Sequence, residues 1–456
     1  MPIIKDGVPY DVKDEKDILR FAKELKGKTL GEWMPDREGL HPTHRKGKFG
    51  LAIEKAVFGI LPNSDSVPDL EEAGVEIKTT PIIDRKRAGK VPKERLVLSM
   101  IDYMTLLDKG WELSFLKKNG KLLIIFYLYE EGRQIYEYKI LDVILWEYPE
   151  DDLRIIKEDW NTIARMVKEG RAHELSERHT MYLGACRKGA GHEGDLREQP
   201  FSDVKAGSRA FSLKQSYVGQ IWKKTNDMDS LMNDPVMFDK EKTFEEKVAD
   251  RFARFKGKRT EDIEKELGIE YITPPKSRYA ILARRMLGVK TSRVAEFDKA
   301  DVSMKTVRIN VKGVPKEDMA FPHFKYEELV AQEWEDSDFY GELNRRFLFV
   351  VYRIDGDDLR FEGVKFWSMP QDDLNEAKRV WEEAVKRIKE YRFNDLPKMS
   401  ESTVSHVRPH GRDSKDKIPA NNGTMQLKRC FWLNRRYIAE QIREDRFGTV
   451  PDNQRK

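Results

Sequence analysis

One short segment of the sequence holds acidic and basic side chains at a spacing that suits phosphodiester hydrolysis. Asp69 precedes Glu76 by seven residues, and Lys78 follows Glu76 by two. Residues i and i+2 of a strand share a face, so Glu76 and Lys78 should point the same way, and a turn at Ala73-Gly74 can fold Asp69 back beside them. Two adjacent carboxylates repel each other unless a cation lies between them, and Mg²⁺ prefers oxygen ligands. The segment therefore predicts a metal site whose lysine orients a water molecule and offsets charge on a phosphate.

A further carboxylate lies on the element expected before this strand. Residues 48–59 carry apolar side chains at helical spacing, and Glu54 falls near the inward face of that helix. It could complete the outer shell of the metal or hold a second ion. Taken alone the motif is a weak signal, because charged residues make up 36% of the chain and an ordinary ion pair on a solvated strand face has the same spacing.

The segment occurs twice, and the two copies differ at the acidic positions. Residues 68–82 read PDLEEAGVEIKTTPI, and residues 295–309 read AEFDKADVSMKTVRI. Three acidic positions change together while neighbouring packing residues persist, which indicates one catalytic copy and one copy that only binds. The aligned residues, first copy then second, are Glu54 and Ala283, Asp69 and Glu296, Glu76 and Ser303, and Lys78 and Lys305.

The repeat extends along most of the chain. Apolar, strand-like runs at 121–129 and 346–354 correspond, as do 145–153 with 366–374 and 209–217 with 429–437. The stretch from 226 is polar and without periodicity, which is typical of a linker. We therefore expect a catalytic domain at 1–225, a linker at 226–243 and, at 244–456, a catalytically inactive domain that binds or regulates.

Each copy mixes helices and strands without strict alternation. Helical spacing is found at 15–25 and 48–59, and a helix at 151–169 should begin after Pro149 because three acidic residues follow it. The pattern predicts an α/β or α+β unit around a mixed sheet, present in two tandem copies. The expected strands lie near 74–80, 94–100, 121–129 and 138–147.

Composition excludes some classes of protein and selects none. Lys and Arg number 84 against 80 Asp and Glu, so the net charge of +4 identifies no partner. Two cysteines provide neither a disulfide framework nor a metal-binding cluster, which suits a reducing compartment. The charged amino terminus does not fit a signal peptide, and no apolar run is long enough to cross a membrane. We expect a cytoplasmic protein with no membrane contact.

A basic stretch after the long helix is suited to DNA. Between residues 178 and 215 arginines and lysines alternate with glycines, which let the backbone approach phosphates, while arginine can read guanine edges. A solvated basic surface is the alternative, and the presence of a basic stretch at the matching place in the second copy argues against it. The DNA-contact candidates are Arg209 and Lys214 in the first copy, with Arg408 and Arg435 in the second.

Asp69, Glu76 and Lys78 resemble the PD-(D/E)xK motif of nucleases. The wider segment from Lys46 to Ile82 is similar to the MutH nicking endonucleases of mismatch repair and to the two-domain type II restriction endonucleases related to them. The resemblance covers most of 20–225 and, less closely, 250–440. It implies that Glu54 is the fourth acidic residue.

The resemblance also implies a function for the basic stretch. Its base-contacting loop falls on Arg187, Lys188 and Gly189. Ser212 departs from the nicking enzymes, which have an aromatic residue there, so their methylation sensing need not carry over.

The favoured hypothesis is a Mg²⁺-dependent type II restriction endonuclease of duplex DNA, with Mn²⁺ as a substitute ion and GATC as the expected site. The second copy would bind a second DNA site, and a transient homodimer on DNA would cut both strands. A strand-nicking repair endonuclease and a non-catalytic DNA-binding regulator remain as alternatives. The regulator would bind DNA without metal and cut nothing.

Overall fold

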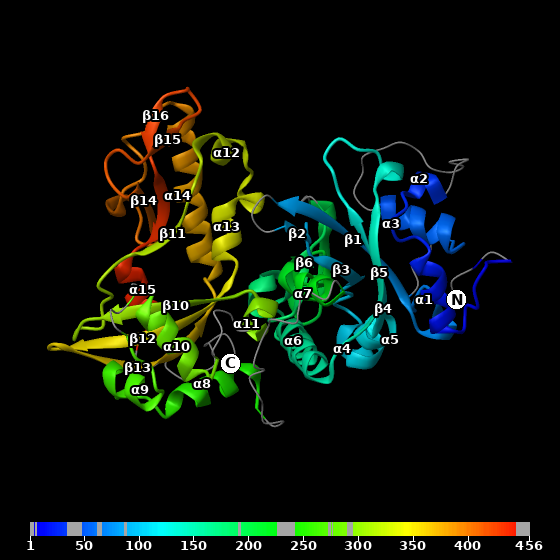
Figure 1. Ribbon diagram of the computed structural model, residues 1–456, viewed down its shortest axis with the longest axis horizontal. Coiled ribbons are helices and arrows are strands. Elements are labelled where there is room, and N and C mark those ends of the chain that lie inside the picture. Colours follow the sequence, from blue (N-terminus) through cyan, green and yellow to red (C-terminus); the bar gives the residue numbers. More distant parts are fainter. Residues whose placement is uncertain are drawn as a thin grey trace. The chain divides into compact units, whose positions relative to one another are not determined.

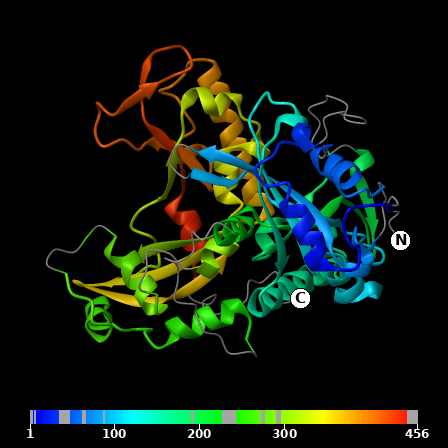
Figure 2. The ribbon, with the colours of Figure 1, turned by 45° about the vertical axis from the view of Figure 1, so that its right-hand side comes forward.

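The computed structural model describes residues 4, 7–33, 48–61, 66–85, 89–189, 193–225, 242–271, 275, 277–289 and 295–443. The chain divides into two compact units (Figures 1 and 2). Unit 1 comprises Met1–Met232 with Asp298–Asp301, and unit 2 comprises Asn233–Phe297 with Val302–Lys456. Residues 226–241 of the expected linker lie outside the described part.

Unit 1 is built on a four-stranded mixed sheet in the order β2-β1-β4-β5, in which β1 and β4 are parallel. A second, antiparallel sheet has the order β3-β9-β6, and β7 and β8 form a two-stranded ribbon. The strands are β1 (Glu76–Arg85), β2 (Gly89–Pro92), β3 (Leu96–Met100), β4 (Lys121–Leu128), β5 (Ile140–Glu147), β6 (Leu183–Arg187), β7 (Leu196–Gln199), β8 (Ser202–Gly207) and β9 (Arg209–Leu213).

Helices cover the first sheet of unit 1. The amino-terminal helices lie against it in both views (Figures 1 and 2), and their apolar side chains share a core with Ile77, Leu123 and Ile125. Phe126 lies against Trp222 of the helix that follows β9, with ring centroids 5.1 Å apart. The main helices are α1 (Glu15–Lys23), α2 (Leu30–Trp33), α3 (Lys48–Ala52), α4 (Leu106–Trp111), α5 (Lys117–Asn119), α6 (Glu150–Lys168) and α7 (Gln215–Thr225), with short turns η1 (Ile53–Val57), η2 (Glu71–Ala73), η3 (Glu112–Leu116), η4 (Ile135–Glu137), η5 (Ala172–Glu174), η6 (Glu177–His179) and η7 (Glu193–Asp195).

Unit 2 repeats this plan with one strand fewer in its first sheet. Its sheets are β10-β12-β13, with β10 and β12 parallel, β11-β17-β14, and the ribbon β15-β16. The strands are β10 (Val302–Ile309), β11 (Met319–His323), β12 (Arg346–Asp355), β13 (Asp358–Trp367), β14 (Ser405–Pro409), β15 (Lys417–Pro419), β16 (Met425–Leu427) and β17 (Arg429–Leu433), and the helices are α8 (Phe244–Ala253), α9 (Thr260–Glu266), α10 (Arg278–Met286), α11 (Ala295–Ala300), α12 (Tyr326–Ala331), α13 (Asp338–Leu343), α14 (Gln371–Lys389) and α15 (Arg435–Gln441), with turns η8 (Trp334–Asp336) and η9 (Met399–Glu401).

Strand registers confirm that the repeat is structural. Glu76 pairs with Leu122 in unit 1, and Ser303 pairs with Phe347 in unit 2. Val97 pairs with Ser212, and the corresponding Ala320 pairs with Trp432. The expected mixed α/β architecture in two tandem copies is therefore confirmed.

The expected elements are present with shifted ends. The strand expected near 74–80 begins at Glu76 and continues to Arg85, because it extends into a hairpin with β2. The long helix α6 begins after Pro149, and acidic side chains in its first turn and basic ones in its last turn match the helix dipole. In the described part of the chain, no helix combines the length and apolarity needed to cross a bilayer.

Candidate active site

A tight turn returns Asp69 to the start of β1. Leu70 and Val75 exchange two backbone hydrogen bonds of 2.9 and 3.1 Å across the turn. Gly74 closes it with φ of 67°, a left-handed conformation that glycine adopts without strain. The turn expected at Ala73-Gly74 is thus present, and it sets Asp69 beside the first residues of the strand.

Asp69 and Glu76 are linked through their own backbone. The Asp69 N–H donates to Oε2 of Glu76 (3.1 Å), and the Ile77 N–H donates to Oδ2 of Asp69 (3.0 Å). Ile77 is buried behind them, whereas Lys78 shares the face of Glu76 and donates from Nζ to its Oε1 (2.6 Å). Asp69, Glu76 and Lys78 therefore lie together, as the alternation of a strand predicts.

Glu54 approaches this group from η1, the π-helical turn that continues α3. Gly50 lets this helix lie close to the strand, because a Cβ there would be 3.2 Å from Oγ1 of Thr79. A π turn widens the helix and changes the direction of its side chains, and such turns are frequent at functional sites. Burial first, and the negative charge of Asp69 second, raise the pKa of Glu54 to about 7.

Burial and mutual charge govern the other ionisable groups of the site. Burial raises the pKa of Glu76, although the positive charge of Lys78 acts in the opposite direction. For Lys78, burial alone would lower the pKa, but attraction to Glu76 and their hydrogen bond outweigh it and the pKa is raised. The pKa values of Glu54 and Glu76 are thus both raised, and a bound cation would favour the charged form of each carboxyl group.

A second lysine, which sequence reasoning missed, faces the same carboxylate. Nζ of Lys118, on α5, lies 3.8 Å from Oε1 of Glu76, and its side chain is 18% exposed. The counterpart of Lys118 in unit 2 is Leu343, which is fully buried. The two residues correspond because each lies four residues before the strand partner of the matching position, Leu122 in unit 1 and Phe347 in unit 2. That replacement of a lysine by a leucine was the available signal, but it lies far along the chain from the motif.

The donor set fits a hard divalent cation. In the described ranges no three His, Cys, Asp or Glu side chains form a ready-made metal cage. Asp69 and Glu76 nevertheless lie in direct contact, Glu54 is near enough for their charges to raise its pKa, and all three offer oxygen. Oxygen-only donors with excess negative charge suit Mg²⁺ better than soft metals.

The matching positions in unit 2 lack this chemistry. Ala283 is fully buried where unit 1 has Glu54, and Ser303 replaces Glu76 on the strand. The side chain of Glu296 lies outside the described part. Lys305 keeps its place in β10, but burial lowers its pKa, whereas the pKa of Lys78 is raised. The lysine survives in unit 2 without the carboxylate that it contacts in unit 1.

The residues expected to read DNA lie at one end of the second sheet of unit 1. Arg187, at the end of β6, pairs with Arg209 at the start of β9, and its side chain is exposed. Lys188 donates its backbone N–H to the Ser208 carbonyl (2.8 Å). Gly189 has φ of 83°, and a Cβ there would lie 2.1 Å from the Asp195 side chain, so only glycine fits.

Two neighbouring residues are turned inward. Lys214 is 9% exposed, and its Nζ donates to the Thr180 carbonyl (2.5 Å). Ser212 is fully buried, and its hydroxyl donates to Oε1 of Glu177 (3.1 Å). The other carboxylate oxygen of Glu177 forms an ion pair with Arg95. Spacing alone did not reveal that the ammonium of Lys214 is used inside the fold.

Unit 2 carries a different side-chain cluster at the equivalent place. The Arg408 guanidinium lies 3.8 Å from the ring centroid of Trp432, the counterpart of Ser212, and bonds Oδ2 of Asp318 (3.0 Å). Asp318 also accepts the backbone N–H of Arg435 (2.8 Å), whose side chain is exposed. Arg408 remains 42% exposed, so this fixed guanidinium is open to a partner.

Comparison with known proteins identifies the family. The family model for the DNA mismatch repair enzyme MutH matches two segments, residues 58–159 and 287–379, one in each unit. The chain is 36% identical to the type II restriction enzyme Sau3AI of Staphylococcus aureus, over 93% of this chain and 97% of that protein. The DNA mismatch repair protein MutH is 30% identical in Shewanella amazonensis and 26% in Escherichia coli O6:K15:H31, over 40% and 39% of this chain and 82% and 76% of those proteins.

The fold, the site and these matches define a nuclease of the MutH-like family, to which the chain belongs. Within that family, similarity along nearly the whole chain places it with the type II restriction endonucleases, of which Sau3AI is one. Nucleases of this restriction type generally use a divalent metal ion.

Proposed function

We propose that this endonuclease hydrolyses duplex DNA at GATC with Mg²⁺, through one catalytic centre in unit 1. The observation that carries the assignment of the centre is the contact of Asp69, Glu76 and Lys78, together with the change of the matching residues in unit 2. GATC is supported by the family resemblance of the motif and of the Arg187–Gly189 loop, and Mn²⁺ should replace Mg²⁺.

The carboxylates would hold the metal and the lysines would act on the reacting groups. Asp69 and Glu76 would bind Mg²⁺, with Glu54 completing its outer shell, and the ion would supply a polarised phosphate and a more acidic water. Lys78 would release Glu76 to the cation and orient the attacking water. Lys118 would approach the phosphate and offset the charge that develops on it. A neutral Glu54 would have to lose its proton before it could assist.

Unit 2 would contribute binding without chemistry. Arg408, held by Trp432 and Asp318, presents a guanidinium in one orientation, which suits a guanine edge or a phosphate. Arg435 lies exposed beside it and would contact the backbone. Each chain would then engage two DNA sites, and because one chain has one catalytic centre, two chains would meet transiently to break both strands.

The test is digestion of a plasmid with a single GATC site by the full-length protein, with Mg²⁺ or with EDTA, followed by sequencing of the ends. Methylated and unmethylated plasmids are run in parallel. We expect metal-dependent double-strand breaks at the site, none with Glu76→Gln, and normal cutting with the matched variant Lys305→Met. Identical cutting by wild type and Glu76→Gln, or no cutting by either, would refute the proposed centre, and products with only one strand cut would favour a nicking enzyme.

A further inference from the structure

A buried carboxylate on α6 holds the chain that leads into the DNA-reading loop. Asp159 is 3% exposed, and its carboxylate accepts the backbone N–H groups of Met181 (2.6 Å), Tyr182 (2.6 Å) and Leu183 (2.8 Å). Burying a charged carboxylate is unfavourable unless hydrogen bonds compensate, and here three consecutive donors do so. The start of β6 is therefore fixed to the long helix by one side chain.

Lys214 holds the same segment from its carbonyl side. Its Nζ donates to the Thr180 carbonyl (2.5 Å), and its backbone N–H donates to the Tyr182 carbonyl (3.0 Å). Asp159 thus accepts hydrogen bonds from the backbone N–H groups of residues 181–183, and Lys214 donates to two carbonyl groups of the same short segment. Their opposite charges also attract, since the charge of Lys214 acts to lower the pKa of Asp159, although burial dominates and raises it to about 6.

Unit 2 has an uncharged residue at each of these two positions. Val380 occupies the position of Asp159, ten residues after the proline that precedes the helix in each unit, and it is buried. Asn434 occupies the position of Lys214, and its Nδ2 donates to the Ser402 carbonyl (2.8 Å). The hydroxyl of Ser402 accepts the Val404 N–H (3.2 Å). Both units therefore use the residue after the last strand as an internal donor to a carbonyl.

The clamped segment leads directly to the loop that would read bases. Leu183 opens β6 and Arg187 closes it, and a strand advances about 3.3 Å per residue with side chains alternating between its faces. A slip of one residue would turn Arg187 to the opposite face. We propose that Asp159 and Lys214 are positioning residues that set the register of β6 and thereby the sequence discrimination of Arg187 and Lys188. This inference rests on the proposed function of the loop.

The inference separates two roles for Lys214. As a positioning residue, it needs a hydrogen-bond donor but no charge, as Asn434 indicates in unit 2. As a phosphate contact, it needs the charge, and its loss would weaken binding to all sequences and reduce the salt dependence by about one contact. Lys214→Gln keeps a donor and removes the charge, whereas Lys214→Met removes both.

The experiment uses the full-length protein and duplexes that contain GATC or differ from it by one base pair. Discrimination is the ratio of cognate to variant, measured as single-turnover cleavage with Mg²⁺ and as binding without metal. The variants are Asp159→Asn, Lys214→Met and Lys214→Gln. The matched control is Asp142→Asn, because Asp142 is also a buried carboxylate, bonded to Lys26 (2.7 Å) and the Val143 N–H (2.8 Å) on β5.

We expect Asp159→Asn and Lys214→Met to lose about tenfold in discrimination, which is the scale of one base contact, while Lys214→Gln and Asp142→Asn retain it. The inference would be overturned if Lys214→Met lowered the melting temperature but left discrimination unchanged. It would also be overturned if Lys214→Met and Lys214→Gln both lost affinity equally for all the duplexes. If Asp159→Asn does not fold, the two Lys214 variants decide. If the wild type binds GATC selectively but does not cut DNA, only the proposed function is refuted. The ratio of binding affinities then still tests whether Asp159 and Lys214 are positioning residues.

Discussion

The two units keep the same framework and differ in the chemistry that they place on it. Tyr217 donates to Asp152 in unit 1 (2.9 Å) and Tyr437 to Asp373 in unit 2 (2.8 Å). A second tyrosine bonds a carbonyl of the ribbon in each unit, at 2.6 Å for Tyr103 and 2.7 Å for Tyr326. Hydrogen bonds that hold the fold are thus repeated, whereas the bonds between Asp69, Glu76 and Lys78 are found in unit 1 alone among the described residues.

The candidate site differs from the matching place in unit 2 at few positions. Glu54, Glu76 and Lys118 correspond to Ala283, Ser303 and Leu343, and the strands around them keep their registers. These replacements therefore leave the strand pairing of unit 2 intact.

Removing the charge of Lys78 should have the largest effect. Lys78→Met should lower the cleavage rate by roughly a thousandfold, because the attacking water would lose the group that orients it and the site would lose a positive charge beside the reacting phosphate. Binding to a GATC duplex should change little. The matched variant Lys305→Met, in unit 2, should cut at the wild-type rate, and a comparable loss in both variants would contradict a single catalytic centre. Single-turnover cleavage measures both.

Lys118→Met should have a smaller effect, a loss of about 10- to 100-fold in the same assay, because its ammonium is farther from Glu76 than that of Lys78. The neighbouring Lys117 is exposed, so Lys117→Met is the control and should remain active. Equal rates for the two variants would remove Lys118 from the site.

Glu54 should make activity and stability depend on pH in opposite ways. Its pKa is raised from 4.5 to about 7, so the native state retains a proton that the unfolded chain has lost in this range. The contribution of Glu54 to the free energy of unfolding is fully present below about pH 4.5 and is lost as the pH rises through about 7. Metal binding improves over the same rise in pH, because the carboxyl group loses its proton. The melting temperature without metal should fall between pH 5 and 8, and Mg²⁺ should restore it.

Glu54→Gln is the control for this pH dependence. It should flatten both profiles, because the group that exchanges a proton is gone. An unchanged pH profile in Glu54→Gln would assign the effect to another residue.

Loss of the stacked guanidinium should affect unit 2 alone. Arg408→Ala should weaken binding of the second DNA site by about tenfold, the usual effect of one arginine contact with a base, without changing the cleavage rate at saturating DNA. Arg412, whose side chain is 91% exposed, provides the control Arg412→Ala. Titration with a GATC duplex measures the stoichiometry and affinity of binding. Equal values for Arg408→Ala and Arg412→Ala would contradict the role assigned to Arg408.

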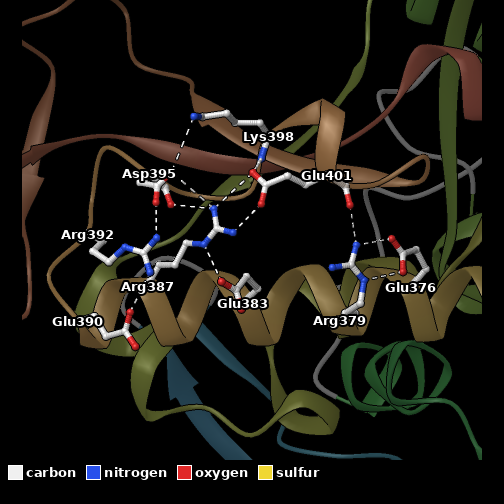
Figure 3. A network of polar contacts seen from close by, with 9 residues as sticks. All are labelled: Glu376, Arg379, Glu383, Arg387, Glu390, Arg392, Asp395, Lys398 and Glu401. Carbon is white, nitrogen blue, oxygen red and sulfur yellow. Dashed lines mark hydrogen bonds and ion pairs between the residues drawn. The ribbon is translucent and has the colours of Figure 1, made fainter.

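The smallest effect is expected at an ion-pair network on α14 (Figure 3). Arg387 bonds Glu383 (2.7 Å), Glu401 (2.5 Å) and the Asp395 carbonyl (3.0 Å), and Arg379 bonds the Glu401 carbonyl (2.7 Å). The network ties α14 to the turn before β14, the junction that unit 1 secures with Asp159.

Because these pairs are partly exposed, Arg387→Met should destabilise this junction by only about 1 kcal/mol, and less in high salt. Hydrogen exchange of residues 399–409 at two salt concentrations measures it. Unchanged exchange would show that the network is not needed.

Much of the centre could be predicted from local spacing. The alternation of a strand places Glu76 beside Lys78, and a glycine turn returns Asp69, since both depend on neighbours in sequence. Lys118 could not be found in this way, because parallel pairing of β1 with β4 brings α5 to the site from far along the chain.

The internal role of Lys214 was equally hidden. A basic residue beside a glycine-rich stretch looks like a DNA contact, and only the fold reveals that its ammonium reaches Thr180. Helical periodicity also gave no sign that the helix changes to a π turn at Ile53–Val57, where Glu54 lies.

Anomalous scattering from a crystal of the full-length protein soaked in Mn²⁺ would locate the metal ion. We predict a peak between the carboxylates of Asp69 and Glu76 and no peak beside Ser303. No peak between Asp69 and Glu76, or one of equal strength beside Ser303, would contradict the claim that only the first unit holds the metal.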